Sequence, residues 1–177
     1  MTQVALSDFR QRKDEHFRSG RGPISGDALA NFTGLTYYPE APEWRYALPL
    51  HAAEGTGEFS LETNSGERRF MELIGAVDVP LPDGGTHALQ VFGQLGDDDR
   101  RSVFIPFRDL TSGAETYGAG RYVDAPLVQQ DGAVTVMLDF NLAYHPYCAY
   151  SGGWTCPLPP LQNRLPVAVQ AGERLPA

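Results

Sequence analysis

The segment RRFMELIGAVDVPLPDGGTHALQVFGQL, residues 68–95, decides the fold of this chain. Two runs rich in Val, Leu, Ile and Phe, Arg68–Val79 and Thr86–Leu95, flank the sequence PDGG at residues 82–85. Asp and Gly tolerate the positive φ of tight turns, so the segment predicts two antiparallel strands joined as a hairpin. The first run is long for one strand, and Gly75 within it predicts a bulge or a crossing between sheets.

The same alternation of β-prone runs and turn residues continues through most of the chain. Connections are short, and no helix of ten residues is expected between strands. This favours antiparallel strands that close into a single β-barrel or barrel-like sandwich over βαβ units. The predicted strands are Phe32–Tyr38, Trp44–Leu50, Gly57–Thr63, Arg68–Val79, Thr86–Leu95, Ser102–Phe107, Arg121–Val128, Ala133–Phe140 and Val167–Ala171.

The two ends of the chain have a different character. Ser7 is a candidate N-cap for a short helix with Phe9 and Phe17 on one face, ending near Pro23. We therefore expect a helical arm over residues 1–22 and a single β domain over residues 23–177. Within that domain, the proline-rich segment Tyr144–Pro166 predicts an ordered, irregular flap.

Composition limits the classes of partner. The 177 residues suit one domain, and the net charge of −8 argues against a protein that binds nucleic acid, which needs a basic face. No window has the length and apolar character of a membrane span, and no signal-peptide core is evident, so we expect a cytoplasmic, acidic protein without a membrane partner. Lys13 is the only lysine among 14 basic residues, which indicates a GC-rich genome or, less strongly, a surface tuned for salt.

Common catalytic and cofactor motifs are absent from the sequence. It has no nucleophile elbow, no phosphate-binding loop and no HExxH zinc motif, so we expect no cofactor. Two cysteines, Cys148 and Cys156, fall short of the four ligands of a zinc site. In a reducing compartment free thiols are favoured, with a redox-active pair as the alternative.

One connection carries more functional groups than a hairpin needs. The stretch FRDLTSGAETYGAGRY, residues 107–122, includes Asp109, Thr111, Glu115, Tyr117 and Arg121. In one interpretation these groups satisfy one another, with Arg121 paired to a carboxylate. In the other, Arg121 and Tyr117 bind a polar or anionic ligand, with Asp109 and Thr111 at the site, while Glu115 acts as an acid or base.

Strand alternation adds a geometric condition. If Arg121 points into the barrel, Val123 follows it inward, while Tyr122 and Asp124 face outward. An inward Arg needs a carboxylate, for which Asp109, Glu115 and Asp139 are the candidates.

A second cluster follows one strand later, where Asp139 and Asn141 share a face of the strand. Tyr144, His145 and Trp154 come next, in a segment dense in aromatic residues. Aromatic side chains with a few polar groups are typical of a small-molecule pocket, but they also serve to dock a flap. A metal site from Asp139, Asn141 and His145 is a weaker alternative, because only one His is available.

Five segments of the chain resemble a prokaryotic domain-of-unknown-function family, number sixteen-eighty-four. The family pattern commonly has Asn where this chain has His145, which weakens any mechanism that needs an imidazole there. The resemblance implies no established activity. The matching segments are RKDEHF (12–17), FTGLTYYP (32–39), WRYAL (44–48), FIPFRDLTSGAETYGAGRYVD (104–124) and LDFNLAYHPYCAYSGGWTCPLPPLQNRLPVAVQAGER (138–174).

From the residues we expect a protein that binds a small polar or anionic ligand in an aromatic-lined pocket. In that pocket Arg121 would neutralise the ligand, Tyr117, Tyr144 and Trp154 would contact it, and Asp139 with Asn141 would orient it. The alternative is a cofactor-independent hydrolase or isomerase that uses Glu115 or Asp139 as acid and base. A structural or interaction subunit is the third class, and a homodimer is left open.

Overall fold

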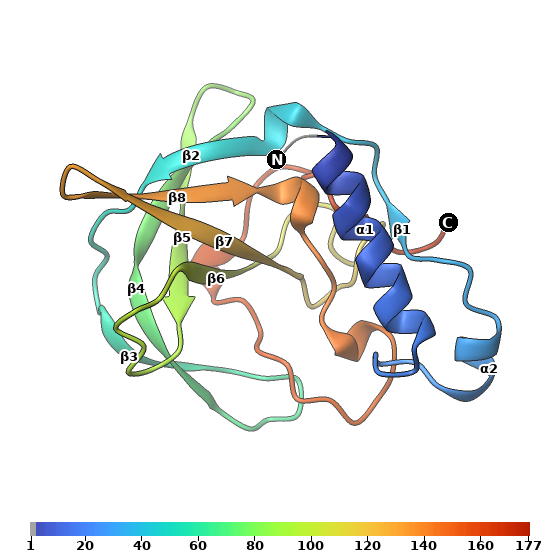
Figure 1. The fold of residues 1–177 in the computed structure, drawn as a ribbon. Coiled ribbons are helices and arrows are strands. Elements are labelled where there is room, and N and C mark those ends of the chain that lie inside the picture. The colour runs from blue at the N-terminus through green and yellow to red at the C-terminus, as the bar shows by residue number, and fades with distance from the viewer. Residues whose placement is uncertain (1–2) are drawn as a thin grey trace.

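A curled antiparallel sheet of seven strands forms the body of the protein, whose computed structural model describes residues 3–177 (Figure 1). The strand order is β2-β8-β7-β6-β5-β4-β3, so nearly every neighbour in space is also a neighbour in sequence. The strands are β2 (Arg45–Pro49), β3 (Gly57–Leu61), β4 (Arg69–Pro80), β5 (Thr86–Gly93), β6 (Ser102–Phe107), β7 (Arg121–Gln130) and β8 (Ala133–Asp139).

The β4–β5 hairpin forms as the turn sequence predicts. Leu81 N donates to Gly85 O at 2.7 Å, and Asp83 Oδ1 accepts from Gly85 N at 3.0 Å. Gly84 has a φ of +94°, which glycine adopts without steric cost. The hairpin prediction is confirmed.

Gly75 marks a break in the register of β4. The pairing of β4 with β5 shifts between Leu73 and Gly75, as expected for a bulge. A Cβ atom at Gly75 would lie 2.4 Å from the carbonyl oxygen of His51. Glycine therefore allows the segment after β2 to approach β4, where His51 and Ala76 exchange backbone hydrogen bonds of 2.9 and 3.0 Å.

The described structure is mostly β, with antiparallel strands, as predicted. The strands do not, however, form a closed barrel. β2 and β3 are the two ends of the ladder, and the isolated bridge between His51 and Ala76 is the contact that brings one end back against β4. The inner face of this curl is filled by apolar side chains, among them Val77, Val91 and Ile105. The interior is a packed core.

The N-terminal helix α1 (Gln3–Arg18) lies across one side of the sheet, followed by the short helix α2 (Gly26–Ala30) (Figure 1). The predicted cap at Ser7 is wrong, because the helix starts four residues earlier, where Ala5 and Leu6 favour helix. Phe17 is buried as expected, stacking on Phe32 at 5.5 Å between ring centroids.

Two predicted strands near the ends differ from the structure. Of Phe32–Tyr38 only β1 (Thr36–Tyr37) is a strand, and it pairs with β9 (Glu173–Arg174) in a separate two-stranded sheet. The prediction of a strand at Val167–Ala171 is wrong, because the carbonyl groups of this segment accept hydrogen bonds from Arg121 and Leu110 instead of from another strand.

The proline-rich flap is irregular, as expected. It includes two 3-10 turns, η3 (Tyr147–Ala149) and η4 (Leu161–Asn163), while η2 (Phe140–Leu142) lies between β8 and the flap. A further 3-10 turn, η1 (Pro42–Trp44), precedes β2. The flap runs along the open end of the sheet and returns to β3, where Leu158 N donates to Glu62 O.

Candidate functional site

Arg121 points into the core and binds other parts of the protein. Its Nη1 donates to the carbonyl oxygens of Ala171 and Glu173 at 2.6 and 3.0 Å. Its Nη2 donates to Val169 O at 2.8 Å and to Asp109 Oδ2 at 3.1 Å. Both side chains of this ion pair are at most 1% exposed. Of the two interpretations of Arg121, the geometry supports the structural one.

The carboxylate of Asp109, like the guanidinium of Arg121, has its hydrogen-bonding groups occupied by other parts of the protein. Its Oδ1 accepts from the backbone N–H and the hydroxyl of Thr111, at 3.1 and 2.6 Å. Its Oδ2 accepts from Val169 N at 2.8 Å, beside Arg121. The carboxylate therefore caps its own loop and anchors the C-terminal segment, since a buried charge must be paired and hydrogen-bonded.

Glu115 and Tyr117 lie at the outer side of the same loop. Glu115 is partly exposed, 3.8 Å from the guanidinium of Arg174, and accepts from Gln170. Tyr117 contributes its backbone N–H, which donates to Nε2 of His145 at 3.2 Å. These residues are near one another in sequence, but the structure does not direct them into a shared pocket with Arg121.

Asp139 and Asn141 form a second internal network. Asp139 Oδ1 accepts from the backbone and side-chain nitrogens of Asn141, both at 2.9 Å, and thereby caps η2. Its Oδ2 accepts from Arg45 Nε at 3.0 Å. The Asn141 amide bonds both backbone groups of Ala41. His145 contacts other groups, so these three side chains do not assemble the metal site considered above.

His145 belongs to a buried charge network that the sequence analysis missed. Its Nε2 accepts from Tyr117 N, so its proton is on Nδ1, which donates to Glu173 Oε1 at 3.2 Å. Glu173 also accepts from Lys13 Nζ of α1 at 2.8 Å, and its side chain is 0% exposed. Burial alone would raise the pKa of Glu173, but the hydrogen bonds from His145 and Lys13 hold it below its ordinary value. This network attaches α1 to β9 and to the flap.

The opposite face of β6 and β7 carries a different set of side chains. In the ladder Phe104 pairs with Asp124 and Phe92 with Phe104, so these three share the outer face. Tyr122 lies on the same face, two residues from Asp124. Val123 and Arg121 point inward and are buried. The alternation predicted from the sequence is therefore correct: Tyr122 and Asp124 face the outer side of the sheet, where Tyr122 is buried and Asp124 is exposed.

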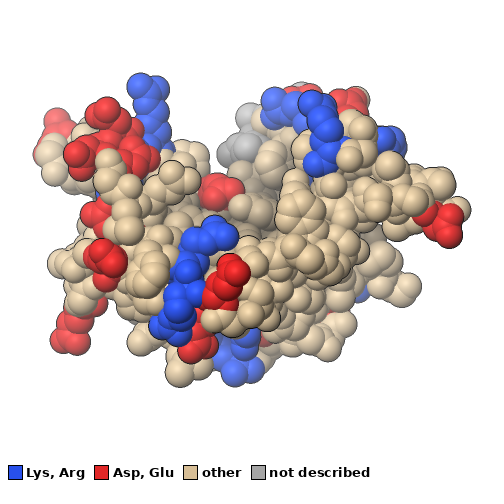
Figure 2. All heavy atoms as spheres, turned by 90° about the horizontal axis from the view of Figure 1, so that it is seen from below, with Lys and Arg blue, Asp and Glu red and all other residues tan. Residues whose placement is uncertain are grey.

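A cleft of about 600 Å³ lies on this outer face. One wall is the β3–β4 hairpin, the other is the start of the flap, and the floor is the outer face of β6 and β7. Seen from below, this side of the molecule is hollowed between two raised parts, with charges of both signs around it (Figure 2). The side chains that give the cleft its character are Arg69, Met71, Phe104, Tyr122, Asp124, Tyr144, Tyr147 and Trp154.

Aromatic rings and neutral phenols dominate the cleft. The ring of Tyr122 lies 4.7 Å from Phe104 and 5.7 Å from Tyr144, measured between centroids. Tyr122 donates to Pro157 O at 2.5 Å, and Tyr144 donates to Asp124 Oδ2 at 2.7 Å. Burial raises the pKa of both phenols above the usual range, and for Tyr144 the neighbouring Asp124 adds to the rise. Both are therefore protonated at neutral pH.

Arg69 supplies the positive charge of the cleft. It lies at the start of β4, is exposed, and donates one hydrogen bond of 3.3 Å, from Nη2 to Thr155 O. None of the ion pairs formed by residues 3–177 includes it. A guanidinium has five N–H donors, so Arg69 keeps donors for a further partner.

Cys148 and Cys156 are joined in a disulfide, which corrects the expectation of free thiols. Their Cα atoms lie 6.6 Å apart because the chain reverses at Gly152 and Gly153 between them. Trp154, inside the closed loop, packs edge-on against Tyr147 at 5.0 Å.

Of the predicted ligand-binding residues, Tyr144 and Trp154 line the cleft, whereas Asp109, Thr111, Tyr117, Arg121 and Asn141 do not. Neither proposed catalytic carboxylate, Glu115 or Asp139, lines it. In the part of the chain that the structure describes, no three His, Cys, Asp or Glu side chains are grouped so as to hold a metal ion. No helix among residues 3–177 is long and apolar enough to span a membrane.

Residues 30–174 match the model of the family described as "Protein of unknown function (DUF1684)". The chain belongs to this family. It is also similar to an uncharacterized protein of Haloarcula marismortui whose structure was solved by NMR in solution. The two chains are 36% identical, with a TM-score of 0.75, over 98% of this chain and 94% of the other. None of the curated proteins matches the chain.

Proposed function

We propose that the protein is a cytoplasmic binding protein for a small organic molecule, which it holds in the outer-face cleft. The ligand would have an aromatic or other flat apolar part and an anionic group. The carrying observation is the combination in one cleft of several aromatic rings with an arginine that has no carboxylate partner among residues 3–177. Pockets for small molecules are mostly apolar, with few polar groups that fix orientation.

Each part of the cleft has a role in this proposal. Phe104 and Tyr122 form a floor on which the apolar part would lie, and Trp154 would cover it from the flap. Arg69 would donate to the anionic group through a charge-assisted hydrogen bond. Asp124, already held by Tyr144, would accept from a polar hydrogen on the ligand.

The alternative of an enzyme using Glu115 or Asp139 has less support. Asp139 is bound by Arg45 and by the backbone of Asn141, and Glu115 lies beside Arg174. Neither faces the cleft, so neither would reach a ligand bound there.

The test uses 1-anilinonaphthalene-8-sulfonate, a fluorescent molecule that joins an aromatic body to one anionic group. Arg69→Gln should weaken its binding about tenfold, because one charge-assisted hydrogen bond contributes roughly 1.5 kcal/mol or more. Trp154→Ala should weaken it by a similar factor through lost ring contact.

Arg68→Gln is the matched control. Arg68 precedes Arg69 in the chain, pairs with Glu62, and does not line the cleft. Its replacement should leave the affinity unchanged. Equal affinity of the Arg69→Gln variant and the unchanged protein would overturn the proposal, and native mass spectrometry of the purified protein would show any molecule it retains.

A further inference from the structure

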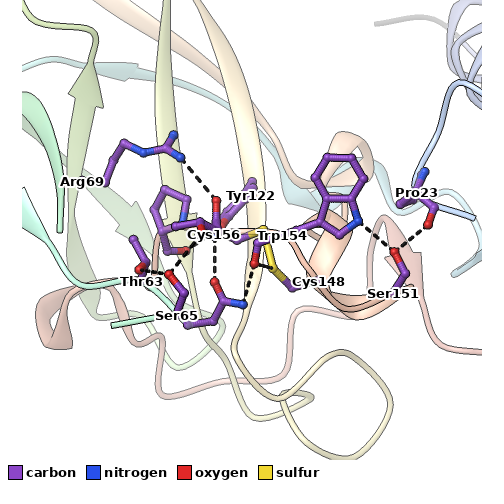
Figure 3. The surroundings of a disulfide bond; sticks show 12 residues. Pro23, Thr63, Ser65, Arg69, Tyr122, Cys148, Ser151, Trp154 and Cys156 are labelled. Carbon is purple, nitrogen blue, oxygen red and sulfur yellow. Dashed lines mark hydrogen bonds between the residues drawn. A yellow bond between two sulfur atoms is a disulfide. The ribbon is translucent and has the colours of Figure 1, made fainter. Parts of the chain in front are cut away.

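The Cys148–Cys156 disulfide joins two parts of the flap that border the cleft. Cys148 belongs to η3, on the wall that packs against α1, whereas Cys156 belongs to the stretch paired with the end of β3 (Figure 3). Cys156 itself lines the cleft together with Tyr147 and Trp154. The bond therefore connects parts of the cleft that are fixed to different elements.

The η3 side is anchored to the N-terminal helix and the turn after it. The hydroxyl of Tyr147 lies 3.1 Å from His16 Nε2 in α1. Ser151 Oγ donates to Pro23 O at 2.6 Å and accepts from Trp154 Nε1 at 2.8 Å. Figure 3 shows this chain of contacts running from the indole through Ser151 to Pro23.

The Cys156 side is anchored to the β3–β4 turn. Asn64 Oδ1 accepts from Cys156 N at 2.7 Å, and Asn64 N donates to Cys156 O at 3.2 Å. The amide of Asn64 also donates to Trp154 O at 2.9 Å. None of these bonds involves sulfur, so reduction of the disulfide does not itself break them.

Between the two anchored sides the backbone passes through Gly152 and Gly153. Both are exposed, and Gly153 has a φ of +86°. A Cβ atom at either would meet nothing within 4 Å, so neighbouring atoms do not confine this link. Glycine also permits the widest range of backbone conformations. The disulfide and the hydrogen bond from Trp154 Nε1 to Ser151 thus connect the two anchored sides, and the glycine pair is the flexible backbone link between them.

The sulfur atoms are placed for exchange with an external thiol. Both cysteines are partly exposed, so the bond is accessible. The carbonyl oxygen of Trp154 lies 3.3 Å from Cys148 Sγ. After reduction the thiol of Cys148 would donate to this oxygen, so the reduced side chain has an acceptor in its present position.

We propose that Cys148–Cys156 is a thiol–disulfide exchange site, and that its reduction by a dithiol loosens the part of the flap around Trp154 that borders the cleft. A thiolate of the reductant attacks one sulfur, the S–S bond breaks, and the other sulfur leaves as a thiolate that takes up a proton. The second thiol of the reductant then closes its own disulfide and releases the second protein thiol. The protein gains two electrons and two protons.

The effect on ligand binding rests on the proposed function, but the effect on the wall does not. The reduced form should keep its fold, because the anchors at Asn64, Pro23 and His16 remain. The two anchored sides would then move relative to each other about Gly152 and Gly153. A ligand held against Trp154 would lose part of its contact, so the oxidised protein is the binding form.

The experiment compares the protein before and after incubation with dithiothreitol, a dithiol. Thiol titration of the folded protein should show two new thiols. Hydrogen exchange measured by mass spectrometry should then rise about tenfold or more over residues 147–157, whereas β6 and β7 stay unchanged. Acrylamide should quench Trp154 more strongly, with little change from Trp44, which is buried.

The double variant Cys148→Ser, Cys156→Ser should resemble the reduced protein and no longer respond to dithiothreitol. A disulfide that dithiothreitol does not reduce in the folded protein, or reduction without faster exchange over residues 147–157, would overturn the inference. Binding of 1-anilinonaphthalene-8-sulfonate is measured separately in both forms. Its absence from both would count against the proposed function alone, since exchange and quenching need no ligand.

Discussion

At the scale of the residue, Arg121 shows how a motif dense in functional groups can serve the fold. Its two terminal nitrogens bind Asp109 and the carbonyl oxygens of Val169, Ala171 and Glu173. These contacts join the start of β7 to the segment Val167–Ala171, which pairs with none of the described strands, and to Glu173 of β9. A buried arginine with these partners replaces the ladder that the segment lacks.

Arg121→Ala should destabilise the protein by about 3–5 kcal/mol, because it leaves the buried carboxylate of Asp109 without its cation. Urea unfolding followed by circular dichroism measures this loss. Arg101→Ala, at an exposed arginine, is the control and should change the free energy of unfolding by less than about 0.5 kcal/mol. A folded Arg121→Ala variant of unchanged stability would contradict the structural role.

At the scale of the element, α1 depends on one buried carboxylate at the far end of the chain. Lys13 of α1 and His145 of the flap both bind Glu173, and Lys13 Nζ also lies 4.5 Å from the ring centroid of Tyr144. The helix, the flap and β9 therefore meet at a single charge. A helix with a weakly apolar face gains its position from this contact as well as from Phe17.

Glu173→Gln should lower the free energy of unfolding by roughly 3 kcal/mol at pH 7, since Lys13 would lose its buried partner. The pKa of Glu173 is depressed below its ordinary 4.5, so the carboxylate stabilises the fold above that pH and loses this contribution as the pH falls further. Urea unfolding between about pH 7 and pH 3 should show the two proteins converging at the acid end.

Glu62→Gln is the matched control for that experiment. Glu62 pairs with Arg68 at the surface, where its side chain is 74% exposed, so its replacement should have little effect at any pH. A difference between the unchanged protein and Glu173→Gln that stayed constant down to pH 3 would show that ionisation of Glu173 does not contribute.

The elements of the sheet could be predicted because their signals are local. The turn at 82–85, the bulge at Gly75 and the outward direction of Tyr122 and Asp124 all follow from turn chemistry and the period of two. The segment Val167–Ala171 was wrongly predicted as a strand, because its apolar residues pack in the core while its carbonyl groups accept hydrogen bonds from Arg121. No local sequence pattern indicates a hydrogen-bond partner that lies fifty residues away in the chain.

The candidate site was harder to predict than the sheet, because it too depends on contacts between segments that are distant in the sequence. Tyr144 and Trp154 were found through the aromatic density of their segment, and both line the cleft. Arg69 was missed because it appeared to be an ordinary charged residue at the start of a strand. Its role depends on the flap, which returns to β3 only in the folded protein.

At the scale of the whole molecule, the net charge of −8 sets how the protein responds to salt. Like charges spread over one surface repel and destabilise the compact state. Raising NaCl from about 0.01 M to about 1 M shortens the screening length from ~30 Å to ~3 Å. We expect this to raise the free energy of unfolding by about 1 kcal/mol, seen as a melting temperature higher by roughly 2–4 °C.

The double variant Asp98→Asn, Asp99→Asn tests whether repulsion between negative charges causes this salt dependence. Both residues are exposed in the turn between β5 and β6, and their replacement changes the net charge from −8 to −6. The variant should melt higher than the unchanged protein at low salt and gain less from added NaCl. A melting temperature independent of NaCl would show that repulsion is not a significant cost.

The ion pair between Lys13 and Glu173 also limits where the chain can be truncated for expression. The stretch that matches the family begins at residue 30, after the whole of α1, yet it includes Glu173. Expressed alone, residues 30–174 would keep a buried negative charge without the lysine that compensates it, and would uncover the rings that Phe17 now shields. We therefore expect the autonomous folding unit to include the N-terminal helix.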